Sequence, residues 1–136
     1  MTTPDTSAPL APSNVAAYTK DGAIAVDGIF CPNQTTTFGM LRALEDAKLA
    51  GKVKFVGFDA DAVLAQAVKD KKIGALVVQN PIAMGDKGLR TAVDLINGKK
   101  VERFIDSGCS LVTTENVNTP ESKELLTPDI SKYLKE

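Results

Sequence analysis

The sequence contains no histidine and no tryptophan. Histidine is the commonest general base and metal ligand in proteins, so its absence argues against hydrolytic and transition-metal chemistry. The two cysteines, Cys31 and Cys109, have no second cysteine or histidine nearby that a zinc site needs. We interpret both as small buried hydrophobic residues rather than as a disulfide pair. The sequence therefore predicts no enzyme, no metal site and no cofactor.

The chain also lacks an excess of either charge. Sixteen Lys and Arg residues oppose seventeen Asp and Glu residues among 136 in total. Nucleic acid binding needs a basic field, so this balance argues against nucleic acid as a partner. The longest apolar stretches, such as 74–78, are far shorter than the roughly 20 residues of a membrane-spanning helix. We therefore expect a soluble chain with a buried core and no membrane insertion.

The N-terminal residues carry few large apolar side chains. Residues 1–13 are rich in Thr, Ser, Pro and Ala. Because such residues bury too little surface to offset the entropy of ordering, we expect a disordered tail there. The segment also lacks the charged and apolar regions of a secretory signal, which predicts a cytoplasmic location if the chain is expressed as it stands. We expect residues 14–136 to form a single domain.

Beyond the tail, apolar patterns predict alternating strands and helices. A short helix near Asn14–Lys20 is followed by these predicted strands and helices in turn: Val26–Cys31, Thr35–Leu49, Val53–Phe58, Ala60–Lys71, Ala75–Val78 and Pro81–Asn97. That order predicts a three-layer α-β-α fold with a mainly parallel, flavodoxin-like (Rossmann-like) sheet. Two β-rich runs, 101–108 and 109–117, predict a hairpin or an edge pair, and Pro120 opens a last helix.

Polar residues follow the three predicted strands: Asn33, Asp59 and Gln79. The carboxyl ends of parallel strands share one edge, and ligands bind there in open α/β sheets. An acceptor carboxylate, two amides that donate and accept, and an aromatic ring such as Phe30, Phe38 or Phe58 suit a polyhydroxylated ring. The ordinary alternative is that Asn33 and Asp59 cap the following helices, while Gln79 satisfies a loop backbone. The two roles are compatible.

Four segments carry a resemblance to a known family: DGIFCPNQTTTFGMLRALEDA, GKVKFVGFDAD, ALVVQNPIAMGDKGLRTAVDLINGKKV and LVTTENV. In this order they resemble the C-terminal half of ribose-type periplasmic sugar-binding proteins of ABC importers, which are related to LacI-type repressors. The most specific parts are VGFD at 56–59 and VVQNP at 77–81. The resemblance implies sugar contacts from Asn33, Asp59 and Gln79. It also implies a monosaccharide ligand such as ribose, an ABC permease as partner and a periplasmic location.

The resemblance also implies that a whole further lobe is missing from this half-size chain. A one-sided site buries little of a sugar, so we expect weak or lost binding. In the family, the helix matching Ile82–Asn97 packs on the other lobe. Without that lobe, the apolar stripe of Leu89, Val93 and Ile96 would be exposed to water. A second copy of the chain could bury this stripe, so we expect a homodimer.

Two further hypotheses about the function of the chain stay open. The chain could be a structural, self-associating lobe without a ligand. It could instead be the effector-binding core of a LacI-type repressor, which is disfavoured because no helix-turn-helix segment or basic patch precedes the matching segment.

Overall fold

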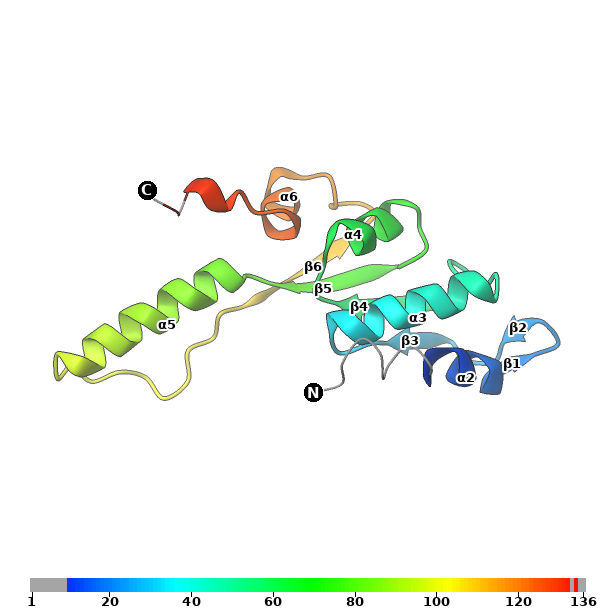
Figure 1. Ribbon diagram of the computed structural model, residues 1–136, viewed down its shortest axis with the longest axis horizontal. Helices are drawn as coiled ribbons and strands as arrows, with labels where there is room; N and C mark the ends of the chain where they lie inside the picture. The colour runs from blue at the N-terminus through cyan, green and yellow to red at the C-terminus, as the bar shows by residue number, and fades with distance from the viewer. Residues whose placement is uncertain (1–9, 133, 135–136) are drawn as a thin grey trace. The chain divides into compact units, whose positions relative to one another are not determined.

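The computed structural model describes residues 10–132 and residue 134 (Figure 1). Its elements are, in chain order, α2 (Leu10–Ala17), β1 (Thr19–Lys20), β2 (Ala23–Ile24), β3 (Gly28–Phe30), α3 (Gln34–Asp46), β4 (Lys54–Phe58), α4 (Ala62–Lys69), β5 (Ala75–Gln79), α5 (Pro81–Ile96), β6 (Cys109–Thr113), α6 (Pro120–Leu126) and a 3₁₀ turn at Ile130–Lys132. The chain divides into two compact units. Unit 1 comprises the residues up to Val78 and from Leu111 onward, and unit 2 comprises Gln79–Ser110.

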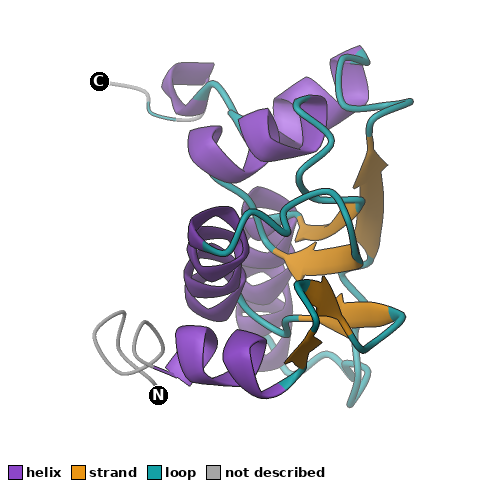
Figure 2. Cartoon of the chain, turned by 90° about the vertical axis from the view of Figure 1, so that its right-hand side faces the viewer, coloured by secondary structure: helices purple, strands orange, loops and turns teal. Residues whose placement is uncertain are grey.

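The main sheet has four strands in the order β3-β4-β5-β6, which are labelled in Figure 1. Figure 2 shows the strands of the chain in orange and its helices in purple. β3 pairs with β4 in parallel, with Phe30 opposite Val56, and β4 pairs with β5 in parallel, with Phe58 opposite Val77. Parallel neighbours need a crossover connection, and α3 and α4 supply the two crossovers. The predicted α/β class with a mainly parallel sheet is therefore confirmed.

The core of unit 1 lies between these helices and one face of the sheet. Connections between parallel strands are almost always right-handed, and both crossovers advance in the same direction across the sheet, so α3 and α4 lie on the same face. Strand side chains that point to that face are buried, while the alternate ones, apart from the small Ala75, are half-buried or exposed. The largest fully buried side chains of this cluster are Phe55, Leu44, Leu64, Ile73, Leu76, Val68, Val112 and Val117.

The N-terminal part differs from expectation. α2 begins at Leu10, inside the segment expected to be a disordered tail, because Ala11 and Val15 are buried in the core cluster. The remainder of that segment, residues 1–9, lies outside the described residues. The helix expected near Asn14–Lys20 ends at Ala17, and a β1–β2 hairpin follows. Its turn residues, Asp21 and Gly22, both have positive φ, as a type I′ turn requires.

Two later expectations also change. In the run expected to form a hairpin, residues 101–108 form no strand, and only β6 pairs into the sheet as an edge strand. The interpretation of both cysteines as buried holds for Cys31 but is wrong for Cys109. Cys109 begins β6, and the first three residues of that strand are exposed. A strand side chain is buried only where something packs on its face of the sheet, and Cys109 is not part of the core cluster, so the apolar run did not ensure its burial.

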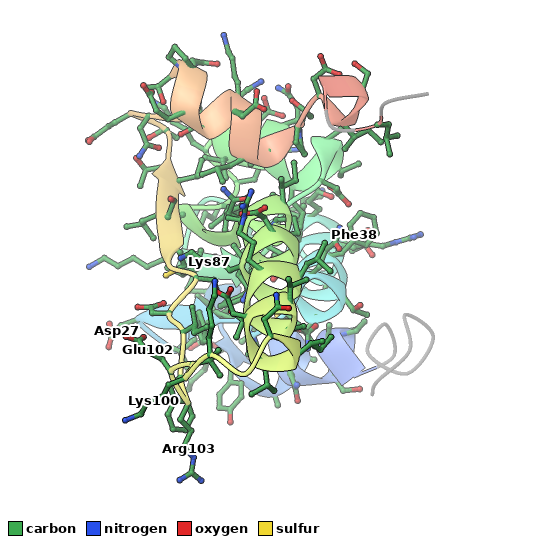
Figure 3. The ribbon with its side chains drawn as sticks, turned by 90° about the vertical axis from the view of Figure 1, so that its left-hand side faces the viewer. Asp27, Phe38, Lys87, Lys100, Glu102 and Arg103 are labelled. Atoms are coloured by element: carbon green, nitrogen blue, oxygen red, sulfur yellow. The ribbon has the colours of Figure 1, made fainter. Side chains whose placement is uncertain are left out.

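Unit 2 consists of α5 and the segment that follows it. Asn80 caps α5 because its Oδ1 accepts a hydrogen bond from Ala83 N at 3.0 Å. No residue of α5 is buried within the structure described. The segment after the helix returns beside it, since Lys87 Nζ donates to Asp106 O at 2.8 Å, and Figure 3 shows Lys87 on α5 with Arg103 projecting outward from the returning segment. Among the described residues, no helix is long and apolar enough to span a membrane.

Neighbouring residues on α4 provide a test of this core. Leu64 is fully buried, whereas Val63 is 53% exposed. We expect Leu64→Ala to lower the free energy of unfolding by about 2–5 kcal/mol, because the change leaves a cavity in the cluster. Val63→Ala, on the same helix, should change it by less than about 0.5 kcal/mol. Equilibrium urea denaturation followed by circular dichroism measures both, and equal effects would contradict the described packing of α4.

Candidate functional site

The residues expected to bind a ligand stand where the strands of the main sheet end. β3 ends at Phe30, three residues before Asn33, and β4 ends at Phe58, directly before Asp59. Asn33, Phe58 and Asp59 all belong to unit 1. Gln79 is the last residue of β5 and the first residue of unit 2. The positions of Asn33, Phe58 and Asp59 relative to one another can therefore be described within unit 1.

Asn33 is the N-cap of α3. Its Oδ1 accepts hydrogen bonds from Thr36 N at 2.9 Å and from Thr36 Oγ1 at 3.0 Å. The capping role considered for Asn33 is therefore confirmed. An amide side chain has both an acceptor and two donors, and the cap uses the acceptor. Because Asn33 is exposed, its Nδ2 amide group is the part that can donate to a ligand.

The capping role considered for Asp59 is wrong, because a different aspartate caps α4. Asp61 Oδ1 accepts hydrogen bonds from Val63 N and Leu64 N, both at 2.8 Å. Asp59 instead extends the sheet, since its backbone N donates to Val77 O at 2.8 Å. The two aspartates are two residues apart, and the sequence alone did not indicate which of them would start the helix.

The backbone of Asp59 is in the left-handed region, with φ of 60°. This conformation costs an ordinary residue about 1–2 kcal/mol, although Asp and Asn tolerate it better than most. Such residues cluster at functional sites, where the surrounding structure holds them in place. Here the bond from Asp59 N to Val77 O fixes the residue at the end of β4. Asp59, a half-buried residue, is thus held by its backbone at the edge of the sheet where β4 ends.

Thr37 joins the first turn of α3 to the end of β4. Its hydroxyl donates to Asn33 O at 2.8 Å and accepts from Phe58 N at 3.0 Å. Both Asn33 and the residue before Asp59 therefore contact one oxygen atom. Sequence reasoning missed Thr37, although it lies in the run Thr35–Thr37 at the start of a predicted helix. That run gave no sign of which hydroxyl would face the sheet.

In a second cluster beside these residues, only Phe38 was among the residues considered from the sequence. Gln34 Nε2 donates to Asp61 Oδ2 at 3.1 Å, which links the first turn of α3 to the cap of α4. Together with Thr35, Phe38 and Gly39 they line a hollow of about 370 Å³. Phe38, labelled in Figure 3, is 42% exposed.

Cys31 lies directly after β3, near this edge, but its environment disfavours thiolate chemistry. Burial raises the pKa of the Cys31 thiol, and a hydrogen bond with Thr36 offsets part of that effect. A raised pKa lowers the thiolate fraction at neutral pH, and the thiolate is the nucleophile. Within the part of the chain that the structure describes, no group of three His, Cys, Asp or Glu side chains is placed to hold a metal ion.

The two thiols should therefore react at very different rates. We expect the exposed Cys109 to be alkylated by iodoacetamide within minutes at pH 8, and the buried Cys31 to react at least about 10-fold more slowly because its pKa is raised. Mass spectrometry of Cys31→Ser and Cys109→Ser measures each thiol alone. Fast modification of Cys31 in the folded Cys109→Ser chain would contradict its described burial.

A model of one protein family matches most of this chain. Residues 1–100 match the model described as "Periplasmic binding protein domain". The chain is 39% identical over 77 residues to the ribose import binding protein of Salmonella typhimurium, and this aligned region covers 57% of this chain and 26% of that protein. It is 34% identical over 76 residues to the D-allose-binding periplasmic protein of Escherichia coli, covering 56% of this chain and 24% of that protein.

Solved structures give a wider match. An ABC transporter solute binding protein of Agrobacterium vitis with bound D-fucose is similar over 90% of this chain and 41% of its own, with a TM-score of 0.79 and 38% identity. A carbohydrate transporter solute binding protein of Agrobacterium radiobacter in complex with D-arabinose is similar over 91% of this chain and 40% of its own, with a TM-score of 0.78 and 33% identity. The chain thus spans about a quarter of the curated relatives and two fifths of these solved chains.

Proposed function

The chain belongs to the periplasmic binding protein domain family, and we propose that it binds a monosaccharide at the edge of unit 1 formed by Asn33, Phe58 and Asp59. The observation that carries this proposal is the position of Asp59 directly after β4, since Asp21, Lys48 and Lys71 share its positive φ without following a strand of the main sheet. A carboxylate residue held with positive φ at the end of a parallel strand stands where open α/β sheets bind ligands.

The side chains at this edge have complementary roles toward a sugar. The Asp59 carboxylate would accept hydrogen bonds from neighbouring hydroxyls, and such charge-assisted bonds are stronger than neutral ones. The Nδ2 group of Asn33 would donate to a third hydroxyl or a ring oxygen. The half-buried ring of Phe58 would contact the apolar side of the sugar. We propose that Gln79, the last residue of β5, offers a further amide to the sugar.

The ligand we propose is a small aldose. Solved relatives contain D-fucose or D-arabinose, and related proteins are named for ribose and D-allose. Because the chain spans a minor part of each relative, we propose weak binding, with a dissociation constant of about 1 mM, equivalent to about −4 kcal/mol. A one-sided site leaves most of the ligand surface in water. We also propose that the chain is periplasmic and that its partner is an ABC permease, which receives the sugar.

Calorimetric titration with ribose, arabinose, fucose and allose, each raised to roughly 50-fold above a millimolar dissociation constant, tests this site. We expect saturable heat with at least one sugar, and a loss of about 10-fold or more in affinity for Asp59→Asn, because a bond to a charged group contributes about 1.5–3 kcal/mol. Asn is the better test than Ala, since it keeps the shape of Asp and its tolerance of positive φ.

The matched control is Asp46→Asn, at the exposed C-terminal end of α3. It removes the same charge from the chain without touching the edge of the sheet, so it should bind as the wild type does. If no sugar gives heat with the wild-type chain, the ligand-binding function is wrong. A structural, self-associating lobe without a ligand would then become the better hypothesis.

We further propose that α5 forms a homodimer contact. Leu89, Val93 and Ile96 are 70%, 47% and 84% exposed. Their spacing of four and three residues places them on one stripe of the helix. An exposed apolar stripe of this kind marks a protein–protein contact. In a homodimer, two copies of the stripe would cover each other across a twofold axis.

Sedimentation velocity at micromolar concentration tests the dimer. We expect the sedimentation of the wild-type chain to correspond to twice the monomer mass of 14.4 kDa. The double variant that carries Leu89→Gln and Ile96→Gln should sediment as a monomer. The control is Arg90→Gln, which removes the exposed ion pair between Arg90 and Asp86 but leaves the apolar stripe unchanged. A wild-type monomer at this concentration would refute the proposal.

A further inference from the structure

Thr37 is a buried polar residue at the proposed sugar site. Its side chain is fully buried, and among the described residues the only other buried polar side chain is Ser122. The single hydroxyl proton goes to Asn33 O at 2.8 Å, and the oxygen accepts from Phe58 N at 3.0 Å. Buried hydroxyls are costly unless they are hydrogen-bonded, and this one is used both as donor and as acceptor.

The bond to Asn33 is ordinary for a threonine in a helix, but the bond from Phe58 is not. Threonine hydroxyls often donate to the carbonyl four residues earlier, and Thr91 does so to Lys87 O at 2.7 Å. Of these two threonines, only Thr37 also accepts a hydrogen bond from a strand. Helix α3 and strand β4 are therefore joined by a hydrogen bond at this point.

The Phe58 amide needs this acceptor because β3 is too short to provide one. Alternate residues of a strand direct their N–H groups to opposite neighbours, and Asp59 N donates to Val77 O in β5. The N–H of Phe58 therefore faces the β3 side. The last bond from that side is Cys31 N to Val56 O, after which the chain leaves the sheet for α3. The Thr37 hydroxyl takes the place of the next carbonyl of the ladder.

Packing holds the hydroxyl in position. A Cβ atom at Gly57 would overlap the Thr37 methyl group and would lie 2.9 Å from Leu76 Cδ2. Gly57 therefore lets the first turn of α3 approach β4 closely. The Thr37 side chain is fixed by contact on one side and by hydrogen bonds on the other.

We infer that Thr37 is a positioning residue, whose hydroxyl sets the distance between Asn33 and the Phe58–Asp59 end of β4. This inference rests on the proposed function for its effect on sugar binding. The spacing of a donor and an acceptor must match the spacing of sugar hydroxyls, and a small displacement weakens both bonds. Thr37 itself need not touch the sugar.

Three variants separate this role from a general loss of stability. Thr37→Val keeps the shape but removes the hydroxyl, whereas Thr37→Ser keeps the hydroxyl and loses the methyl group. Thr91→Val is the control, because it removes the same helical bond where no strand is attached. The readouts are amide hydrogen exchange at Phe58 relative to Leu76 in the core of β5, and sugar affinity by calorimetry.

We expect Thr37→Val to speed exchange at Phe58 by about 10-fold or more relative to Leu76, and to weaken sugar binding by about 10-fold, the equivalent of one lost hydrogen bond. Thr37→Ser should keep exchange at Phe58 and sugar affinity close to those of the wild type. Thr91→Val should change neither exchange at Phe58 nor sugar affinity. Sugar binding that is equal in Thr37→Val and the wild type would overturn the inference and leave the proposed function intact.

The exchange measurement keeps the two proposals distinguishable. A wild-type chain that binds no sugar contradicts the proposed function, while slow exchange at Phe58 that Thr37→Val removes still supports the positioning contact. If Thr37→Val does not fold, the wild type and Thr37→Ser decide the question. Fast exchange at Phe58 in either folded chain would overturn the inference.

Discussion

The parallel pairing of β3, β4 and β5 is the constraint on which the rest of unit 1 depends. Parallel neighbours cannot be joined by a tight turn, so each connection must cross the sheet through a helix. The crossovers bury one face of the sheet and bring the carboxyl ends of the strands to one edge. Hence the same pairing that builds the core also gathers Asn33, Phe58 and Asp59.

Much of this arrangement could be predicted from the sequence. Buried parallel strands are continuous apolar runs, and polar residues directly after them mark the edge. That reasoning located β4, β5, α3 and α4, and it named Asn33 and Asp59. It failed where burial depends on tertiary contacts. The few apolar residues of α2 sufficed for a core helix, and Cys109 is exposed although it lies in an apolar strand.

The details of the site were less predictable, because they depend on which of several similar residues faces the sheet. Asp59 and Asp61 are both good helix caps, and only the end of β4 decides that Asp61 has this role. Three consecutive threonines begin α3, yet one hydroxyl is directed at Phe58. The division after Val78 was also not predicted, although the apolar run of β5 ends at that residue. These choices depend on backbone direction over a single residue.

The positive φ of Asp59 has a consequence for how such a site changes in evolution. Folding alone favours a short list of residues at this position, because Asp, Asn and Gly adopt the conformation at least cost. The fold therefore preserves the backbone conformation at residue 59 but not the carboxylate. A single change to Asn or Gly would remove the proposed sugar contact at little cost in stability, so binding at this edge could be lost without loss of the fold.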